Sequence, residues 1–311
     1  MDTFQPALPQ NAYAPSLDPS ALLDALGLLG ERQVTPAQGG ASTAVWRVDH
    51  QGHRYALRLL PEGTAPSLTQ ELAAMNAARP VLPMPDLVDS CTWNGRPVML
   101  LDWCPGQLLI SHLMRLDPGS PVFRTLARSV GTLLSGLHAL PVPPEFQDDG
   151  RWIEHAGPDE AALKDQLRER SRLPSSLLHL DYQPFNILAY DTRVTGVIDW
   201  SKACAGDPGA DLAYTLTLGQ LSPVGPAPGP RVRSPEQILV RHRFAQELQG
   251  GYFAGKPRYT DMPLYLAWAG AAILRTAQHK IGQPGQGIQP EHLEPVRRWR
   301  DTWKRRAGLP A

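Results

Sequence analysis

Hydrophobic positions change their spacing along the chain, from strand-like runs in the first hundred residues to helical repeats afterwards. The early runs are separated by turn sequences such as Gly39-Gly40 and Asn94-Gly95, a pattern typical of antiparallel hairpins. Strands are expected over 34–35, 44–48, 55–59, 86–92 and 97–102. One helix is expected among them, beginning after Ser67, because Ser67-Leu68-Thr69-Gln70 fits a capping box. An earlier helix is expected near 19–29, after a loose arm over residues 1–16.

The remainder of the chain repeats its apolar residues mainly at helical spacing. Helices are expected over 122–140, 208–218, 235–249, 263–279 and 291–306, with a proline-rich loop over 222–233. Asp207 is expected to cap the helix that begins at Pro208. A single hairpin near 186–199 interrupts the helices. The pattern therefore predicts an α+β fold, with a small antiparallel sheet and one helix followed by a larger, mostly helical part.

That hairpin carries the candidate chemistry. Its two β-rich runs, 187–190 and 194–198, flank a turn centred midway between Asn186 and Asp199, which predicts that these two residues are cross-strand neighbours about 5 Å apart. Amide and carboxylate oxygens suit Mg²⁺, which takes one or two protein ligands and completes its shell with phosphate and water. Asp181 precedes them in a loop that Pro184 keeps from becoming helical. A carboxylate there can orient a substrate hydroxyl and accept its proton during phosphoryl transfer.

Residues 179–186 read H-x-D-x-x-x-x-N, and the strand after them ends in Ile198-Asp199-Trp200. This sequence resembles the catalytic and metal-binding loops of the aminoglycoside phosphotransferase and choline kinase group, which shares the protein-kinase-like fold. The resemblance spans roughly residues 33–215. It implies a bilobal molecule, with a nucleotide-binding N-lobe over 1–103 and a C-lobe over 104–311 that holds the catalytic loop, the metal loop and the substrate-binding helices.

The resemblance also implies how the N-lobe would bind a nucleotide. Gly39, Gly40 and Ser42 match the glycine-rich loop that covers the phosphates. Arg58 matches the strand residue that contacts the α- and β-phosphates, and Glu71 is its expected helix partner.

The remaining site residues implied by the resemblance lie at the hinge and in the C-lobe. Adenine would bond to the backbone of Asp102 and Cys104 at the hinge. Asp181 would act as the catalytic base, and Asn186 and Asp199 would hold Mg²⁺.

Some positions depart from the family pattern. The family usually has glycine where this chain has Leu180, often histidine and glycine in place of Gln183 and Phe185, and often glutamate in place of Ser201. None of these departures removes the expected base or a metal ligand. His179 is expected to be structural, bonded to the backbone of the metal loop.

Composition narrows the classes of partner. Lysine and arginine total 30, and so do aspartate and glutamate, so net charge gives no argument for nucleic acid or an anionic membrane. Residues 231–311 nevertheless hold 14 basic and 6 acidic residues. The first residues lack a secretory signal and the apolar runs are too short to span a bilayer, so a cytoplasmic protein is expected. The three cysteines, far apart and without a C-x-x-C pair, indicate neither disulfides nor structural zinc.

These observations favour a small-molecule kinase that transfers the γ-phosphate of ATP, or GTP, to a substrate hydroxyl. One alternative is a catalytically inactive nucleotide-binding regulator on the same fold. Another is a nucleic-acid adaptor that uses the basic segment 297–306, although a solvated basic face on a terminal helix is the favoured explanation of that segment. The resemblance leaves aminoglycosides, macrolides, choline, homoserine, sugars and fructosamines open as acceptors. The basic segment after residue 230 favours a neutral or anionic one.

Overall fold

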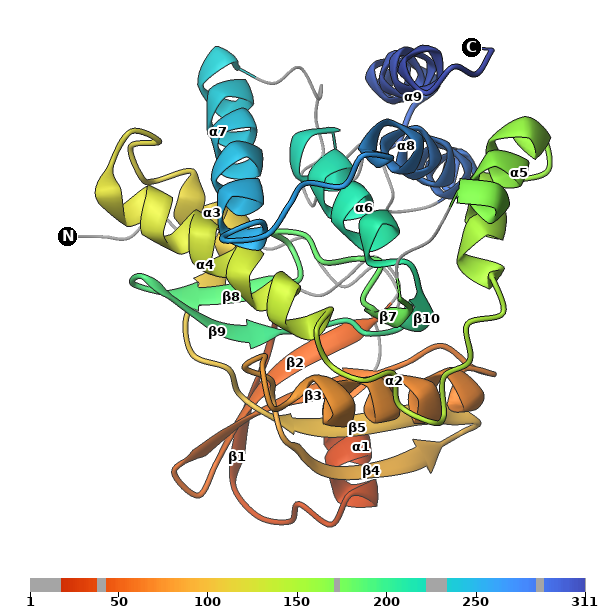
Figure 1. Cartoon of the computed structure of the whole chain (residues 1–311). Helices are drawn as coiled ribbons and strands as arrows, with labels where there is room; N and C mark the ends of the chain where they lie inside the picture. Colours follow the sequence, from red (N-terminus) through yellow and green to blue (C-terminus); the bar gives the residue numbers. More distant parts are fainter. Residues whose placement is uncertain (1–17, 38–42, 171–173, 222–233, 284–287, 311) are drawn as a thin grey trace.

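A five-stranded antiparallel sheet and a larger helical region make up the molecule (Figure 1). The computed structural model describes residues 18–37, 43–170, 174–221, 234–283 and 288–310. The sheet has the order β1-β2-β3-β5-β4. Its strands are β1 (Arg32–Pro36), β2 (Ala44–His50), β3 (His53–Leu59), β4 (Leu87–Trp93) and β5 (Arg96–Asp102). The expected strands are therefore present. The expected arm over 1–16 and the proline-rich loop over 222–233 lie outside the described residues.

Two tight turns set the register of this sheet. Gln51-Gly52 and Asn94-Gly95 both adopt positive φ, at 49° and 79° and at 48° and 75° respectively. Two consecutive residues with positive φ form the hairpin turn whose twist matches that of the flanking strands. The turns pair His50 with His53 and Trp93 with Arg96.

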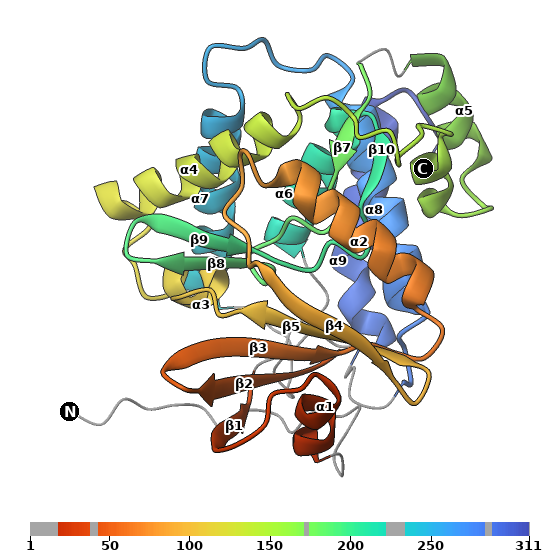
Figure 2. The same cartoon turned by 90° about the horizontal axis from the view of Figure 1, so that it is seen from below.

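Each face of the sheet is covered by one helix. Helix α1 (Pro19–Ala25) contributes Leu22 and Leu23 to a small core on one face. Helix α2 (Ala65–Ala78) packs on the other, where Met75 joins the main core of the helical region. Strand β5 is buried on both faces over most of its length. Figure 2 shows α2 lying between the sheet and the helical region.

The predicted start of α2 is wrong. The helix begins at Ala65, two residues before the expected capping box, and its N-cap Thr64 makes no side-chain cap bond. Thr64 instead donates its hydroxyl to the Pro61 carbonyl at 2.7 Å. Proline at the first turn lacks an N–H that would need a partner, so Pro66 permits this earlier start.

The helical region contains the five expected helices and several shorter elements. Its helices are α3 (Leu109–Leu113), α4 (Pro121–Leu137), α5 (Ala161–Arg170), α6 (Pro208–Leu221), α7 (Pro235–Tyr252), α8 (Met262–Gln278) and α9 (Glu294–Arg306), with the 3-10 turns η1 (Arg151–Ala156) and η2 (Pro290–Leu293). Its strands are β6 (Gln107–Leu108), β7 (Ser176–Leu178), β8 (Ile187–Tyr190), β9 (Arg193–Val197) and β10 (Cys204–Gly206). The sequence patterns do not indicate α3, α5, β6, β7 or β10.

Helix α6 forms the centre of this region. It lies between α7 and α8 (Figures 1 and 2), and every residue from Pro208 to Gly219 is buried. Asp207 caps it as expected, because its Oδ1 accepts the Gly209 amide at 2.8 Å. A helix buried on all sides holds the loops at its N-terminus in a fixed position.

Helices α4 and α7 approach each other through glycines. A Cβ added at Gly131 of α4 would overlap the Leu248 carbonyl oxygen of α7, and one added at Gly251 would overlap the Arg128 carbonyl oxygen. Backbone, rather than a flexible side chain, fills the space at both positions. The two helices can therefore pack this closely only if these residues lack side chains.

We predict that Gly131→Ala lowers the free energy of unfolding by about 1–3 kcal/mol, because the new methyl group forces α4 and α7 apart. Gly219→Ala on α6 is the matched control, since its Cβ would lie at an ordinary 3.7 Å from Phe244. Alanine improves helix propensity by about 1 kcal/mol over glycine, so this control should be neutral or stabilising. Urea unfolding measures both. Equal stability of the two variants would contradict the packing argument.

Candidate active site

The hairpin of β8 and β9 brings the candidate metal residues to one end, but with a register that differs from the prediction. Tyr190 pairs with Arg193 and Ile187 with Val197, with a shift after Leu188. The Ile198 amide then donates to the Asn186 carbonyl at 2.9 Å. Asn186 therefore lies opposite Ile198, so the expected cross-strand pairing of Asn186 with Asp199 is wrong by one residue.

The cause is local. Asp191 adopts a positive φ of 52°, which allows a turn of two residues in place of the expected three. The register shift leaves Thr195 as an extra residue in β9, and its hydroxyl donates to the Pro105 carbonyl at 2.5 Å. Asp199 itself has φ 64°, so the chain turns sharply there, just beyond the last paired residues.

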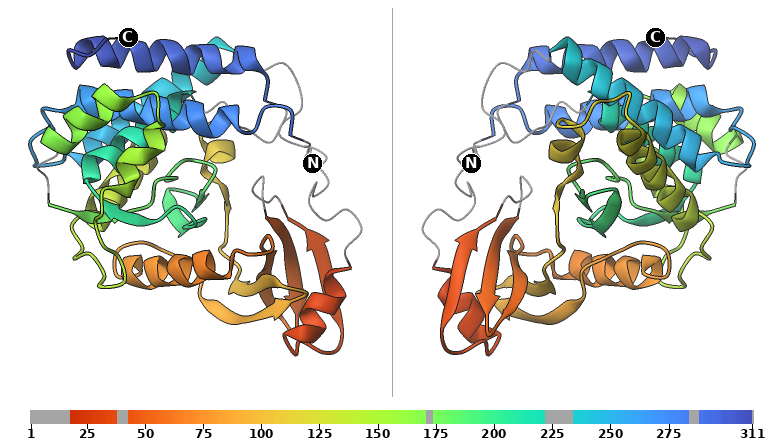
Figure 3. Two further views of the ribbon diagram at one scale, coloured as in Figure 1. Left: turned by 90° about the vertical axis from the view of Figure 1, so that its right-hand side faces the viewer. Right: turned by 90° about the vertical axis from the view of Figure 1, so that its left-hand side faces the viewer.

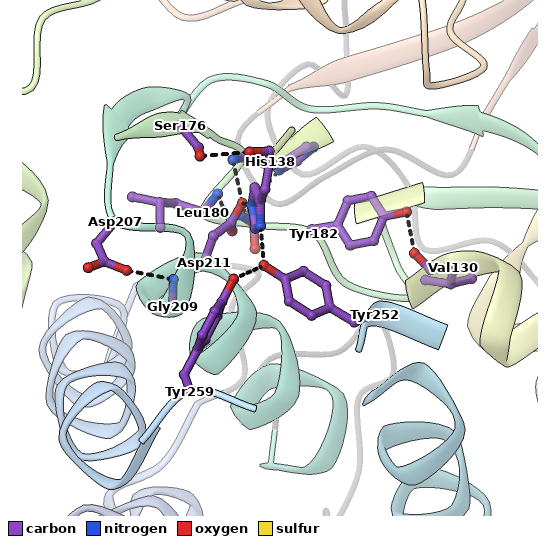
Figure 4. Close-up of polar contacts among 12 residues, drawn as sticks. Val130, His138, Ser176, Leu180, Tyr182, Asp207, Gly209, Asp211, Tyr252 and Tyr259 are labelled. Carbon is purple, nitrogen blue, oxygen red and sulfur yellow. Dashed lines mark hydrogen bonds and ion pairs between the residues drawn. The ribbon is translucent and has the colours of Figure 1, made fainter. Parts of the chain in front are cut away.

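The loop before Asn186 is held by one buried carboxylate, Asp211 of α6. Its oxygens accept the backbone amides of His179 at 2.8 Å and Leu180 at 2.9 Å. The His138 imidazole Nε2 lies 3.1 Å from the same carboxylate, and its Nδ1 lies 2.7 Å from the Tyr252 hydroxyl (Figure 4). Burial alone would raise the pKa of Asp211, but these hydrogen bonds and the neighbouring histidines lower it below the ordinary value. Asp211 is therefore ionised and fixes the loop.

Leu180 shows why this position in the loop favours glycine. It has a positive φ of 52° and is almost completely buried. A leucine pays about 1–2 kcal/mol for this conformation. The buried side chain and the bond from its amide to Asp211 hold the residue there. The departure from glycine thus leaves the loop in a left-handed turn.

His179 is a buried, structural residue, as expected. Its Nδ1 accepts the Asp181 amide at 3.2 Å, and its ring packs 4.4 Å from Trp200. Burial lowers the pKa of His179 below the ordinary value. The ring is therefore neutral and packs within the core.

Asp181, the candidate base, is held through both its side chain and its backbone. Its Oδ1 accepts a hydrogen bond from the side-chain Nε2 of Gln183 at 2.8 Å, and its Oδ2 lies 3.3 Å from Lys202 Nζ. The Asn186 Nδ2 donates to the Asp181 carbonyl at 3.0 Å, which leaves the Asn186 amide oxygen directed away from that bond. The sequence did not indicate a role for Lys202, because a single lysine shortly after Asp199 forms no recognisable pattern.

Arg58 and Glu71 form the expected ion pair between β3 and α2. Arg58 Nη1 lies 2.8 Å from Glu71 Oε1, and the two side chains are only 13% and 1% exposed. Burial lowers the pKa of Arg58, but Glu71 and then Asp199 outweigh it, so the net shift is upward. Burial likewise raises the pKa of Asp199, and Arg58 and the Ser201 hydroxyl outweigh that effect, so the net shift is downward. Arg58 and Asp199 therefore stabilise each other's charged form.

A second contact joins α2 to the segment after Asp199. Gln70 Nε2 donates to the Ala203 carbonyl at 3.0 Å. Gln70 precedes Glu71, so one turn of α2 contacts both strand β3, through Arg58, and the segment after Asp199. The sequence patterns did not indicate this role for Gln70, because they contained no signal for its distant partner.

The hinge residues follow β5. The Asp102 amide donates to the Asp86 carbonyl at 2.9 Å, so this N–H is not available to a nucleotide. The Cys104 amide makes no hydrogen bond to any residue that the structure describes. Burial, followed by Asp102 and Asp86, raises the pKa of the Cys104 thiol to about 11, so this cysteine is an inert thiol. Gly39, Gly40 and Ser42 lie outside the described residues.

The described residues contain no group of three or more histidine, cysteine or acidic side chains able to hold a metal ion. Asp199 and Asn186 offer a smaller set of donors, one carboxylate and one side-chain amide. Across the same ranges, no helix is long and apolar enough to cross a membrane. Cys91, Cys104 and Cys204 are free thiols, as expected.

Comparison with known proteins agrees with this geometry. The model of the phosphotransferase enzyme family matches residues 33–259. A putative aminoglycoside phosphotransferase from Ralstonia eutropha JMP134 is 18% identical, with a TM-score of 0.57 over 91% of this chain and 94% of that one. A thermostable aminoglycoside phosphotransferase mutant, solved with ADP and hygromycin B, is 16% identical, with a TM-score of 0.63 over 94% of this chain and 99% of that one.

A curated mouse protein, acyl-CoA dehydrogenase family member 10, is 24% identical over 250 residues. The match covers 67% of this chain and 22% of the mouse protein, so this chain spans about a fifth of that relative's length.

The structural comparisons show that the fold is that of the kinase-like phosphotransferases, which confirms the expected α+β architecture. The chain belongs to the phosphotransferase enzyme family.

We predict that protein stability falls as the pH drops below about 6.5, the ordinary pKa of histidine. His179 has a lowered pKa in the folded protein, so the unfolded chain takes up its proton first and is favoured as the pH falls. His179→Asn keeps an acceptor for the Asp181 amide but removes the titration. Its free energy of unfolding, measured in urea from pH 7 to 5, should therefore depend less steeply on pH.

The exposed His242→Asn on α7 serves as the control and should keep the wild-type slope. Burial also lowers the pKa of His155, with Lys202 and Arg275 adding to the effect, so part of the slope should persist in His179→Asn. A slope identical to that of the wild type in His179→Asn would contradict the prediction.

Proposed function

We propose that the protein is a small-molecule kinase that transfers the γ-phosphate of ATP, or GTP, to a hydroxyl group of its acceptor. The observation that carries this proposal is the placement of Asp181 beside Asn186 on a loop anchored by Asp211, together with the electrostatic interaction of Asp199 with Arg58 of the Arg58–Glu71 pair. Structural relatives are solved with ADP or AMP-PNP and hygromycin B, which supports a nucleotide and a hydroxyl-bearing small molecule as substrates. The N-lobe would extend over 1–103 and the C-lobe over 104–311.

The residues present fit a magnesium ion. Asp199 is ionised, and Asn186 has its amide nitrogen engaged with the Asp181 backbone, so oxygen donors remain for the ion. When bound, Mg²⁺ neutralises charge on the β- and γ-phosphates. Arg58 would contact the nucleotide phosphates. The backbone amide of Cys104 would donate a hydrogen bond to the purine ring of the nucleotide. Gly39, Gly40 and Ser42 would cover the phosphates.

In the proposed reaction, the acceptor hydroxyl gives its proton to a carboxylate oxygen of Asp181 as the hydroxyl oxygen bonds to the γ-phosphorus. The bond from that phosphorus to the β–γ bridging oxygen breaks, and the nucleoside diphosphate leaves with that oxygen. The bonds from Gln183 and Lys202 hold the Asp181 carboxylate in one orientation. Such positioning supplies most of the catalysis in phosphoryl transfer.

The alternative of an inactive nucleotide-binding regulator would need Arg58, Glu71 and Asp199 but no base. The bonds that orient Asp181 have no purpose in such a protein. This argues for the kinase, and the first experiment below separates the two.

Asp181→Asn is expected to lower kcat at least about 100-fold while leaving nucleotide affinity unchanged, because the amide cannot accept the proton. Release of the nucleoside diphosphate with an accepted hydroxyl substrate measures kcat, and calorimetry measures nucleotide affinity. Asp165→Asn, an exposed aspartate on α5, is the matched control and should be fully active. Unchanged turnover in Asp181→Asn would exclude it as the base.

Asp199→Ala is expected to abolish the stabilisation of the protein by Mg²⁺ and nucleotide. A ligand at a hundred times its Kd stabilises a folded protein by about 2.7 kcal/mol, which shifts the wild-type Tm by several degrees. The measurement compares Tm with Mg-ATP, Mg-GTP and no nucleotide for both proteins, each against its own baseline. Nucleotide with a chelator is the control for the ion. A full shift in Asp199→Ala would exclude it as a metal ligand.

A further inference from the structure

A tight turn directly follows the candidate metal ligand. The Ala203 amide donates to the Trp200 carbonyl at 2.9 Å, which closes a four-residue turn with Ser201 and Lys202 at its centre. The Ala203 carbonyl accepts the bond from Gln70 of α2, and Trp200 is only 1% exposed. Figure 3 shows the neighbouring hairpin of β8 and β9 between α2 and the long helices. The turn is therefore fixed to α2 on one side and to the core on the other.

The two central residues of this turn each contact a carboxylate of the candidate site. The Ser201 hydroxyl donates to Asp199 Oδ1 at 2.7 Å. Lys202 Nζ lies 3.3 Å from Asp181 Oδ2. Lys202 is the only charged side chain of the turn. Two consecutive residues thus join the candidate metal ligand to the candidate base and place one cation beside that base.

Lys202 is held in place and still open to a ligand. Its Nζ lies 5.6 Å from the centre of the Tyr214 ring, and Tyr214 is buried on α6, 5.9 Å from the Trp268 ring. The Lys202 side chain is 35% exposed. An ammonium group has three N–H donors, and the contacts with Asp181 and Tyr214 engage at most two of them. At least one donor can therefore bind an oxygen of a ligand.

Charge makes a phosphate the ligand that fits this lysine. Burial disfavours the charge on Lys202, but Asp181, followed by Tyr214 and Asp199, outweighs it and raises the pKa of the lysine above the ordinary value. Lys202 is thus a cation. In the proposed reaction the γ-phosphate approaches both Asp181 and Asp199, whose carboxylates repel it. A cation fixed between these groups offsets the repulsion and stabilises the charge on the phosphoryl oxygens during transfer.

We propose that Lys202 binds an oxygen of the γ-phosphate and keeps that contact while the phosphoryl group moves to the acceptor. The inference rests on the kinase function proposed above and adds a catalytic residue to it. Lys202 keeps its proton and forms no covalent bond. The β–γ bridging oxygen leaves with the diphosphate, the acceptor oxygen takes its place on phosphorus, and the oxygen bound by Lys202 stays on the phosphoryl group. Lys202 should therefore strengthen the binding of a nucleoside triphosphate but not that of the diphosphate.

Nucleotide binding tests this contact without an acceptor. Mg-AMP-PNP, which keeps a γ-phosphate, and Mg-ADP are titrated calorimetrically into the full chain, and Mg-GMP-PNP and Mg-GDP are used in the same way. Lys202→Met, of similar length but uncharged, should weaken the triphosphate analogue at least about tenfold and the diphosphate less than about twofold. Lys202→Arg keeps the charge and should recover part of the loss. Lys202→Gln replaces Lys202→Met if the Tm shows that the latter is unfolded.

Lys164→Met is the matched control, because Lys164 Nζ also pairs with a carboxylate, that of Glu154 at 2.8 Å, but does so from α5. It should leave the affinities for both nucleotides unchanged. Equal weakening of both nucleotides in Lys202→Met, or of neither, would overturn the inference and leave the kinase proposal standing. A wild type that binds no nucleotide would instead overturn the kinase proposal, and the inference with it.

A double variant separates direct contact from an effect through Asp181. A role limited to holding the Asp181 carboxylate ends when Asp181→Asn removes the ion pair. Lys202→Met made in the Asp181→Asn protein should still weaken Mg-AMP-PNP at least about tenfold, because the contact with the γ-phosphate does not depend on that carboxylate. A loss that disappears in this background would make Lys202 a positioning residue for Asp181 and overturn the inference.

Turnover tests whether the contact persists during transfer. With the acceptor used for Asp181→Asn, Lys202→Met should lower kcat about 100-fold and change the KM for that acceptor little, since the charge on the phosphoryl oxygens is stabilised as it moves. Lys164→Met should keep the wild-type kcat. An unchanged kcat in Lys202→Met would exclude Lys202 from the reaction and overturn the inference.

Discussion

The buried carboxylate of Asp211 is the constraint on which the catalytic loop depends. An ionised group with no exposure is tolerated only when its oxygens are fully paired, and here two consecutive backbone amides and the His138 ring supply the partners. His138 contacts Tyr252, and Tyr252 contacts Tyr259 at 2.8 Å, so the network joins α4, α6 and the end of α7. Because α6 is buried on all sides, its Asp211 holds the loop of His179 and Leu180 in a fixed position against the core. Leu180 can keep its left-handed conformation only within this arrangement.

Helix α2 links the sheet to the segment around Asp199. Glu71 pairs with Arg58, whose charge interacts with Asp199, and Gln70 bonds to Ala203 in the segment that follows Asp199. Gln70 and Glu71, neighbours on one turn of α2, thereby fix the position of β3 relative to Asp199. A shift of α2 would alter both contacts at once. A movement of the sheet would therefore reach the proposed site through the position of α2.

The fold could be predicted from the sequence because local patterns encode it: turn pairs for the sheet and apolar repeats for the long helices. The candidate site residues stay a prediction that rests on the spacing from Asp181 to Asn186. Prediction from the sequence fails where the outcome depends on contacts between distant segments. The register of β8 and β9 differs because Asp191 adopts a left-handed conformation and Thr195 bonds to Pro105. Helix α5 buries only Leu163 and Leu167 in an otherwise polar segment, so it has almost no periodic signal. Lys202 is positioned by its contacts with Asp181 and Tyr214, and no local sequence pattern predicts either contact.

The pairing of Lys202 with Asp181 bears on what kind of base this carboxylate can be. Lys202 Nζ lies 3.3 Å from Oδ2 and the Gln183 side chain donates to Oδ1, so both carboxylate oxygens have a fixed partner. Phosphoryl transfer passes through a loose transition state in which the acceptor hydroxyl keeps its proton until late, so orientation matters more than basicity. The two side-chain contacts of Asp181, from Gln183 and Lys202, restrict the orientation of its carboxylate. The local electrostatics thus suit a carboxylate that aligns a hydroxyl for attack.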